Sequence, residues 1–315
     1  MYKINRTTYK TFPNQLFAFG TFDDFLSDDT YLYLRTYGHE GKYAGDPNLT
    51  PFENMIQATI KFVDSVLTPE KLTEFKKKMG SSAIILPVHG FKYKGLTDSN
   101  YVFETKDTSS NLMTILAAIK IHHFVGNPIS FSCRQKETVT RNASSTIHRI
   151  SSPTVLKADI KKNVEYIAFD DHIYSGSTVA NLVGEIIKGC AKCNKIICLA
   201  TNPIVKVLKL KKETLDAIKK DPLYASIEQE WKKYFGFGYD GLTEVEANLL
   251  IENFVKKKIN VMSEIKEYKK QKYVPTYDKS LWPKLKETVT YNNLADLGLP
   301  NYGIKIINKI KKDGK

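Results

Sequence analysis

Short apolar runs alternate with segments of helical periodicity through the middle of the chain. The apolar runs, each rich in strand-forming residues, are Ser82–Val88 (SAIILPV), Pro128–Cys133, Asn163–Phe169 (NVEYIAF) and KIICLA around Cys198. Between them, Tyr101–Phe124 and the residues after Thr178 repeat apolar positions at helical spacing. Strands that are apolar on both faces and alternate with helices are typical of a parallel sheet covered on both sides. The pattern therefore predicts an α/β core.

The regions on both sides of this core are predicted to be mainly helical. Thr50-Pro51-Phe52-Glu53 and Thr68-Pro69-Glu70 each place a capping Thr before a Pro at the first helical position. Later in the chain, TNPIVKVLKL is a candidate last strand, and amphipathic helices are predicted over Leu215–Lys220, Leu223–Phe235 and Leu242–Met262. We therefore divide the chain into a helical N-terminal extension (1–80), the α/β core (81–203) and a Lys-rich helical C-terminal region (204–315) that packs on the core.

The most informative stretch is YIAFDDHIYSGSTVANL, residues 166–182. A predicted strand ends in Asp170 and Asp171, and a turn rich in Ser, Gly and Thr leads directly into a predicted helix. The start of such a helix offers unpaired backbone N–H groups to an anion, and Gly176 lets the backbone come close to it. The two carboxylates are badly placed for phosphate but well placed for sugar hydroxyls or a divalent ion. The stretch therefore predicts a ribose-phosphate site, with a purely structural turn as the alternative.

The segment FDDHIYSGST resembles the phosphoribosyl pyrophosphate (PRPP) signature of type I phosphoribosyltransferases. This resemblance implies a parallel-sheet phosphoribosyltransferase core in which Asp170 and Asp171 contact the ribose hydroxyls. It also implies that Tyr174, Ser175, Gly176, Ser177 and Thr178 wrap the 5′-phosphate, and that Mg²⁺ is held through the ligand beside the two aspartates. Two residues depart from the family pattern: Ser175 replaces the usual Thr but keeps the hydroxyl, and His172 stands where an aliphatic residue is common.

A second part of the family pattern lies upstream. The run Ser82–Val88 and the following HGFKYKGLTDSN resemble the first sheet strand of the family and its pyrophosphate-binding loop. The candidate residues of this loop are His89, Gly90, Lys92 and Lys94. The lysines bring positive charge to the place of the diphosphate, and glycine lets the backbone close on it. A solvated loop with two lysines is the alternative.

Arginines are rare in this Lys-rich chain, since only five of its 47 basic residues are arginines. Three of them, Arg134, Arg141 and Arg149, fall between a predicted strand and the signature strand. In the family a mobile loop at this place closes over the pyrophosphate, and the planar fork of arginine suits phosphate oxygens. We therefore select Arg134, Lys136 and Arg141 for the closing loop and count Arg134 and Arg141, with the two aspartates, as catalytic candidates. A polar surface loop is the alternative.

The composition leaves nucleic-acid binding open. A formal charge of +13 favours a nucleic-acid or polyphosphate partner, but the lysines are scattered over predicted helix faces. No apolar stretch reaches the length needed to cross a membrane, and no signal-type apolar block follows the N-terminus. We therefore expect a cytoplasmic protein without a membrane partner.

Two further groups of residues have both a functional and a structural interpretation. Cys190, Cys193 and Cys198 have a metal-ligand spacing but lack a nearby fourth ligand, so we expect core cysteines rather than a zinc site. In FGFGYDG, Phe237 or Tyr239 would stack on an acceptor base. The favoured alternative is that these aromatic rings anchor a loop to the core.

We therefore predict an enzyme that transfers, or releases, the 5-phosphoribosyl group of PRPP to a nitrogen acceptor. The signature and the large helical additions also resemble phosphoribosyltransferase-like proteins of bacterial conflict systems, including those beside reverse transcriptases in retrons. That resemblance implies an anti-phage toxin effector controlled by a protein partner. The alternatives are a non-catalytic module that senses PRPP or a nucleotide, and an enzyme that cleaves a nucleotide in the same pocket. The oligomeric state is left open.

Overall fold

The main sheet of the protein is mostly parallel. The computed structural model describes residues 4–26, 28, 30, 31, 34, 51–88, 91–93, 101–105, 112–135, 146–270, 288–291 and 306–308. Six strands lie in the spatial order β1–β8–β7–β2–β5–β10, and β6 pairs with β5 as the antiparallel exception. The strands are β1 (Gln15–Thr21), β2 (Ala83–Val88), β5 (Ile129–Gln135), β6 (Leu156–Ala158), β7 (Glu165–Ile173), β8 (Lys192–Thr201) and β10 (Ile306–Asn308). The predicted α/β class is confirmed, and the sheet is consistent with the expected core.

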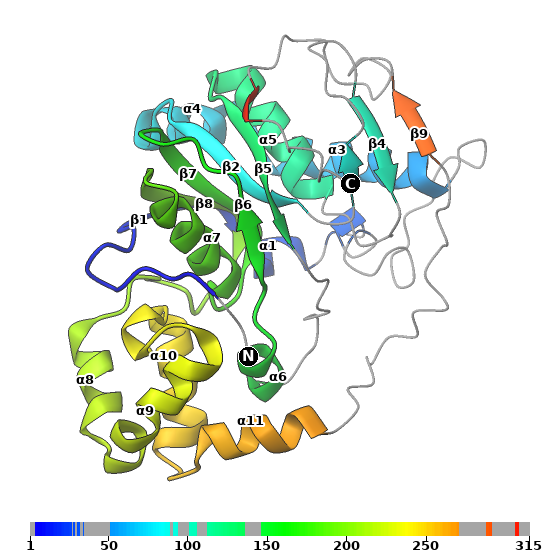
Figure 1. The fold of residues 1–315 in the computed structure, drawn as a ribbon. Coiled ribbons are helices and arrows are strands. Elements are labelled where there is room, and N and C mark those ends of the chain that lie inside the picture. The colour runs from blue at the N-terminus through cyan, green and yellow to red at the C-terminus, as the bar shows by residue number, and fades with distance from the viewer. Residues whose placement is uncertain are drawn as a thin grey trace, which may run out of the picture.

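Helices cover both faces of this sheet, as its apolar strands require (Figure 1). On one face, the strand residues Ile84, Ile167 and Ile197 belong to a core shared with α3, α4 and α5. On the other face, Ile85, Ala168 and Ile196 pack against α7. The helices are α3 (Pro51–Val66), α4 (Pro69–Met79), α5 (Leu112–Val125) and α7 (Ser177–Lys188). The two predicted Thr-Pro helix starts are confirmed, since α3 begins at Pro51 and α4 at Pro69.

The C-terminal helices form a group with its own apolar core at one end of the sheet (Figure 1). The elements are α8 (Lys212–Lys220), α9 (Pro222–Phe235), a 3₁₀ turn (Tyr239–Gly241), α10 (Glu244–Leu250), a π-helical turn (Ile251–Val255) and α11 (Val261–Lys270). The prediction of one helix over Leu242–Met262 is wrong, because α10 ends in the π-helical turn and α11 starts anew. The candidate strand in TNPIVKVLKL is also wrong: β8 ends at Thr201, and Lys209 forms only an isolated bridge with Thr243.

Other strands occur where helix or loop was expected. β1 lies within the stretch assigned to the helical extension, but it pairs in parallel with β8 at the edge of the main sheet. Tyr101–Thr105, expected to be helical, forms β4 in a small antiparallel sheet with β3 (Phe91–Tyr93) and β9 (Thr288–Tyr291). A short helix, α1 (Phe22–Phe25), follows β1, and α6 (Thr146–Ser151) precedes β6. Among the described residues, no helix is long and apolar enough to cross a membrane.

Residues 4–12, which we call the N-terminal arm, run across α7 before β1 begins. A Cβ atom added at Gly184 of α7 would lie 2.0 Å from the carbonyl oxygen of Asn5, so only glycine lets the arm lie this close. The side chain of Asn5 donates a hydrogen bond to Glu185 on the same helix. The apolar side chain of Ile4 enters the core of the C-terminal helices. The arm therefore joins the sheet domain to the C-terminal region.

Replacing Gly184 by Ala tests this close approach. We expect the free energy of unfolding to fall by about 1 to 3 kcal/mol, because the new methyl group forces the arm away from α7. Urea titration followed by circular dichroism measures the change. Lys188→Ala, an exposed change on the same helix, is the control and is expected to stay within about 0.5 kcal/mol of the wild type. A Gly184→Ala protein as stable as the wild type would contradict the packing described here.

Candidate functional site

The carboxyl ends of β2 and β7 meet at the point where the strand order reverses. From β2 the chain passes to β5 on one side, then returns across β2 to β7 and continues to β8. α5, which joins β2 to β5, and α7, which joins β7 to β8, pack on opposite faces of the sheet. In open α/β sheets a crevice for ligands forms at such a switch point. The predicted site residues of β5 and β7 lie at this edge.

The aspartates of the signature lie at the end of β7, and neither is free of neighbours. Asp170 is buried, with 8% of its surface exposed, and one of its carboxylate oxygens accepts a hydrogen bond of 3.1 Å from the backbone N–H of Asp171. A carboxylate oxygen of Asp171 lies 2.9 Å from Nδ1 of His172. The ring of His172 packs against Phe22 and Tyr31, whose ring centres lie 5.4 and 5.3 Å away. His172 therefore connects the acid pair with aromatic residues from the N-terminal part of the chain.

The turn after these aspartates has the shape that the sequence predicts for an anion site. Gly176 precedes the first residue of α7 with φ of +79°, a left-handed conformation that favours glycine. A Cβ atom there would also lie 2.7 Å from the side chain of Leu208. Within the described residues, the backbone N–H groups of Ser177, Thr178 and Val179 have no acceptor. Backbone N–H groups in this position, at the start of a 12-residue helix, can donate hydrogen bonds to an anion.

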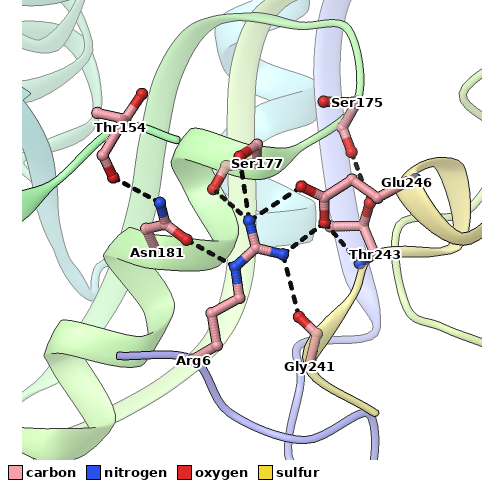
Figure 2. A network of polar contacts seen from close by, with 8 residues as sticks. All are labelled: Arg6, Thr154, Ser175, Ser177, Asn181, Gly241, Thr243 and Glu246. Carbon is pink, nitrogen blue, oxygen red and sulfur yellow. Dashed lines mark hydrogen bonds and ion pairs between the residues drawn. The ribbon is translucent and has the colours of Figure 1, made fainter. Parts of the chain in front are cut away.

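The side chains of the turn are held differently from one another. The hydroxyl of Ser177 accepts a hydrogen bond from Arg6, so it belongs to a structural network (Figure 2). The hydroxyl of Thr178 lies 3.4 Å from that of Thr154. The ring of Tyr174 is partly exposed, and the guanidinium carbon of Arg149 lies 4.1 Å from its centre. Of the predicted phosphate ligands, Ser177 therefore offers its backbone N–H group rather than its hydroxyl.

The C-terminal region holds the other side of this turn. The carbonyl oxygen of Ser175 accepts a 2.6 Å hydrogen bond from the hydroxyl of Thr243. Thr243 caps α10 together with Glu246, which accepts a hydrogen bond from the backbone N–H of Thr243. Glu246 in turn pairs with Arg6. Figure 2 shows Arg6 between the start of α7 and the start of α10. The sequence analysis missed Arg6, Thr243 and Glu246, because nothing in the local pattern connects them with residues 175–177.

The structure places the other predicted residues only in part. Arg134 is half-buried at the carboxyl end of β5, in register with Val88 at the end of β2. Lys92 lies in β3, where its backbone is in register with Glu104 of the antiparallel strand β4. This segment is therefore a strand rather than the expected loop. His89, Gly90, Lys94, Lys136 and Arg141 lie outside the described residues. The structure therefore brings Arg134 and the acid pair to one edge, and the rest of the pyrophosphate and closing loops stay predictions.

The aromatic residues Phe237 and Tyr239 differ in their burial and in their neighbours. Tyr239 is fully buried in the core of the C-terminal helices, as the anchoring interpretation predicts. Phe237 is half-buried, has the guanidinium group of Arg6 4.4 Å from its ring centre, and lines a crevice that also touches Ser175 and Ser177.

The cysteines behave as core residues with one exception. Cys133, Cys193 and Cys198 are buried, whereas Cys190 is exposed. Burial raises the pKa of Cys193 to about 12 and that of Cys198 well above its usual range, and the carboxylates of Asp170 and Asp171 raise the latter further. These two thiols are therefore protonated at neutral pH. Among the described residues, no cluster of three His, Cys, Asp or Glu side chains is arranged to hold a metal ion.

Comparisons with known proteins give distant similarities. No protein-family model matches the chain. Protein TraN of Escherichia coli is 23% identical over 197 residues, which cover 62% of this chain and 40% of TraN. The chain thus spans about two fifths of the length of this relative. The crystal structure of adenine phosphoribosyltransferase from Leishmania tarentolae covers 61% of this chain and 74% of its own, with 14% identity and a TM-score of 0.25. A TM-score this low carries no argument about function.

The buried pair of Arg6 and Glu246 predicts a pH dependence of stability. Burial alone would raise the pKa of Glu246, but the charge and hydrogen bonds of Arg6, with those of Thr243 and Ser177, hold it below the ordinary 4.5. A depressed carboxyl pKa stabilises the fold above the pKa of the unfolded chain, and this contribution is lost as the pH falls through the folded-state value. We expect Glu246→Gln to cost about 3 to 5 kcal/mol at pH 7, because the Arg6 charge stays buried without its partner.

Urea unfolding between pH 3 and pH 7 tests both parts of this prediction. The wild type is expected to lose stability more steeply than Glu246→Gln as the pH falls below about 4.5, since the variant lacks this titrating group. Asp216→Asn, which breaks an exposed ion pair with Lys212, is the control and should change stability by less than about 1 kcal/mol. Parallel pH profiles of wild type and Glu246→Gln would show that Glu246 titrates normally in the fold.

Proposed function

We propose that this chain binds PRPP or another 5-phosphorylated ribose, together with Mg²⁺, at the carboxyl ends of β2 and β7. We propose further that it transfers or releases the 5-phosphoribosyl group, with a nitrogen acceptor in the transfer reaction. The observation that carries the proposal is the single turn that joins a pair of carboxylates to a set of unpaired N–H groups. A ligand that bonds to both sets of groups must carry an anionic group and hydrogen-bond donors a few ångströms apart. A sugar phosphate has both, in its phosphate and its hydroxyl groups.

The 5′-phosphate fits the start of α7. The N–H groups of Ser177, Thr178 and Val179 lie at the positive end of the helix dipole and lack acceptors among the described residues. Phosphate oxygens accept such hydrogen bonds well, and little protein has to be reorganised to form them. A carboxylate ligand would also fit this end, but it would bring no hydroxyl groups to the acid pair.

The ribose fits the acid pair. Carboxylates repel phosphate, so hydroxyl groups or a cation suit the place beside Asp170 and Asp171 better than a second phosphate does. Proteins usually hold Mg²⁺ through one or two carboxylates together with substrate phosphates. Asp170 and Asp171 provide two carboxylates for this kind of coordination. They would therefore hold Mg²⁺ that is bound together with the diphosphate. When bound, this ion would neutralise charge on the diphosphate oxygens.

In the transfer reaction the bond between C1 of the ribose and the diphosphate oxygen breaks, and the diphosphate leaves with the electron pair. The lone pair of a nitrogen acceptor forms the new bond to C1, and the acceptor then loses a proton to solvent or to the leaving group. The role of the chain is to fix the sugar at both ends, so that C1 can move toward the acceptor. Arg134, at the same edge of the sheet, would compensate the charge that grows on the diphosphate.

Replacing both aspartates by asparagine tests the proposal. We expect Asp170→Asn/Asp171→Asn to weaken binding of PRPP with Mg²⁺ by at least about a hundredfold, because each hydrogen bond to a charged group contributes about 1.5 to 3 kcal/mol. Isothermal titration calorimetry measures the affinity, and a screen of nitrogen bases for released diphosphate measures turnover. Thermal unfolding of the variant checks that the fold is kept.

The chain contains a matched control for this experiment. Asp23 and Asp24 are also adjacent acids that follow a parallel strand of the same sheet, but no Gly-Ser-Thr turn comes after them. Asp23→Asn/Asp24→Asn makes the same change of charge and should leave the affinity for PRPP unchanged. Equal affinity in all three proteins would refute the ribose site. Binding without turnover for any base would favour the sensing module over the transferase.

A further inference from the structure

Arg6 donates hydrogen bonds to four different residues although its side chain is only 1% exposed. Nε donates to Asn181 at 2.6 Å, Nη1 donates to the carbonyl oxygen of Gly241 at 3.1 Å, and Nη2 donates to the hydroxyl of Ser177 at 3.0 Å. Both carboxylate oxygens of Glu246 accept from the same guanidinium group. These contacts join the N-terminal arm, the first turns of α7 and the start of α10 (Figure 2).

These contacts fix the helix start that bears the anion site. Ser177 is the first residue of α7, and Asn181 lies one helical turn later. The amide group of Asn181 also donates to the carbonyl oxygen of Thr154 at 2.6 Å, which ties this turn to the segment before β6. Arg6 therefore binds two successive turns on one side of α7. The N–H groups of Ser177, Thr178 and Val179 lie on the backbone between these two contacts.

The same network holds the residue on the other side of Gly176. Glu246 accepts a hydrogen bond from the backbone N–H of Thr243 at 2.9 Å, and the Thr243 hydroxyl donates to the carbonyl oxygen of Ser175. Arg6 is thus hydrogen-bonded to Ser177 directly, and it is linked to Ser175 through the hydrogen bonds of Glu246 and Thr243. The left-handed Gly176 between them is held from both ends.

The charge of Arg6 is not available to a ligand. Its carboxylate partner Glu246 neutralises it, and the side chain is out of reach of solvent. A role of Arg6 in anion binding must therefore be one of geometry. Lysine cannot replace it, because an ammonium group lacks the planar fork that reaches Asn181, Ser177 and Glu246 together.

We infer that Arg6 is a positioning residue of the anion site: it sets the direction of the N–H groups at the start of α7 and couples the C-terminal region to them. The inference rests on the proposed function for the identity of the ligand. Displacements of about 1 Å at groups that position a ligand reduce function by up to about a hundredfold. We therefore expect Arg6→Lys to weaken binding of PRPP with Mg²⁺ by at least about tenfold.

The test compares Arg6→Lys with Asn5→Ala, a change at the neighbouring residue of the same arm. The side chain of Asn5 donates a hydrogen bond to Glu185, two helical turns beyond Ser177, rather than to a residue of the turn. Calorimetry with PRPP and Mg²⁺ gives the affinity of each protein. Hydrogen exchange gives a readout without ligand: the amide of Ala180 donates to the carbonyl oxygen of Gly176 at 2.8 Å, so a loosened first turn exposes it. Thermal unfolding measures the loss of stability in each variant.

We expect Arg6→Lys to lose affinity and to speed exchange at Ala180, and Asn5→Ala to do neither. Equal affinity and equal exchange in Arg6→Lys and the wild type would overturn the inference, and so would equal losses in both variants. A wild type that does not bind PRPP refutes the proposed function instead, and exchange at Ala180 still decides the role of Arg6. If Arg6→Lys does not fold, Glu246→Gln, which keeps the shape of the pair, should speed exchange at Ala180 more than Asn5→Ala does.

Discussion

A guanidinium group that is removed from water keeps its positive charge, so its donors must find acceptors inside the protein. Arg6 meets this requirement with acceptors from α7, from the turn at Gly241 and from α10. If one of these segments moves alone, a buried charge or N–H donor is left without a partner. The free-energy cost of that loss is larger than the stabilisation that an exposed ion pair provides. The position of the C-terminal helices relative to the sheet edge depends on this requirement.

The carboxyl edge of the sheet carries two carboxylates and, close to them, backbone N–H groups that favour an anion. Asp170 and Asp171 lie near the end of β7, and the N–H groups at the start of α7, which have no acceptor in the part of the chain that the structure describes, follow a few residues later. The structure keeps the two apart by the left-handed turn at Gly176. Cys198, beside Asp170 on β8, stays a neutral thiol because burial and both carboxylates raise its pKa. The side chain next to Asp170 on the neighbouring strand is therefore uncharged.

The described arginines and the lysines of the C-terminal helices lie in different parts of the structure. Lysines of the C-terminal helices form ion pairs with nearby acids, among them Lys256 with Glu252 and Lys266 with Glu230. Such exposed pairs add little stability, and they spread charge over the surface rather than concentrate it. By contrast, Arg6, Arg134 and Arg149 all lie near the edge where the ligand is proposed to bind. These three arginines therefore lie closer to the proposed site than the lysine ion pairs of the C-terminal helices do.

The local structure of the candidate site could be predicted from the sequence, because strand, acid pair, turn and helix start follow one another within residues 165–188. Hydrophobic periodicity and capping residues report on such near neighbours. The same reasoning predicted the starts of α3 and α4, whose Thr-Pro signals are local. It missed β1, because the short run QLFAFGT becomes a strand only by pairing with β8.

Only the tertiary structure decided which distant residues complete the turn. Arg6 lies 171 positions from Ser177 along the chain, and Thr243 lies 68 positions from Ser175. A hydrogen bond leaves no periodic pattern in the sequence when its partners come from separate elements. The sequence by itself therefore determined the order of strand, acid pair, glycine turn and helix start, on which the proposal of a sugar-phosphate ligand rests. The fold decided how the turn is held, because that depends on side chains that meet only after the chain has packed.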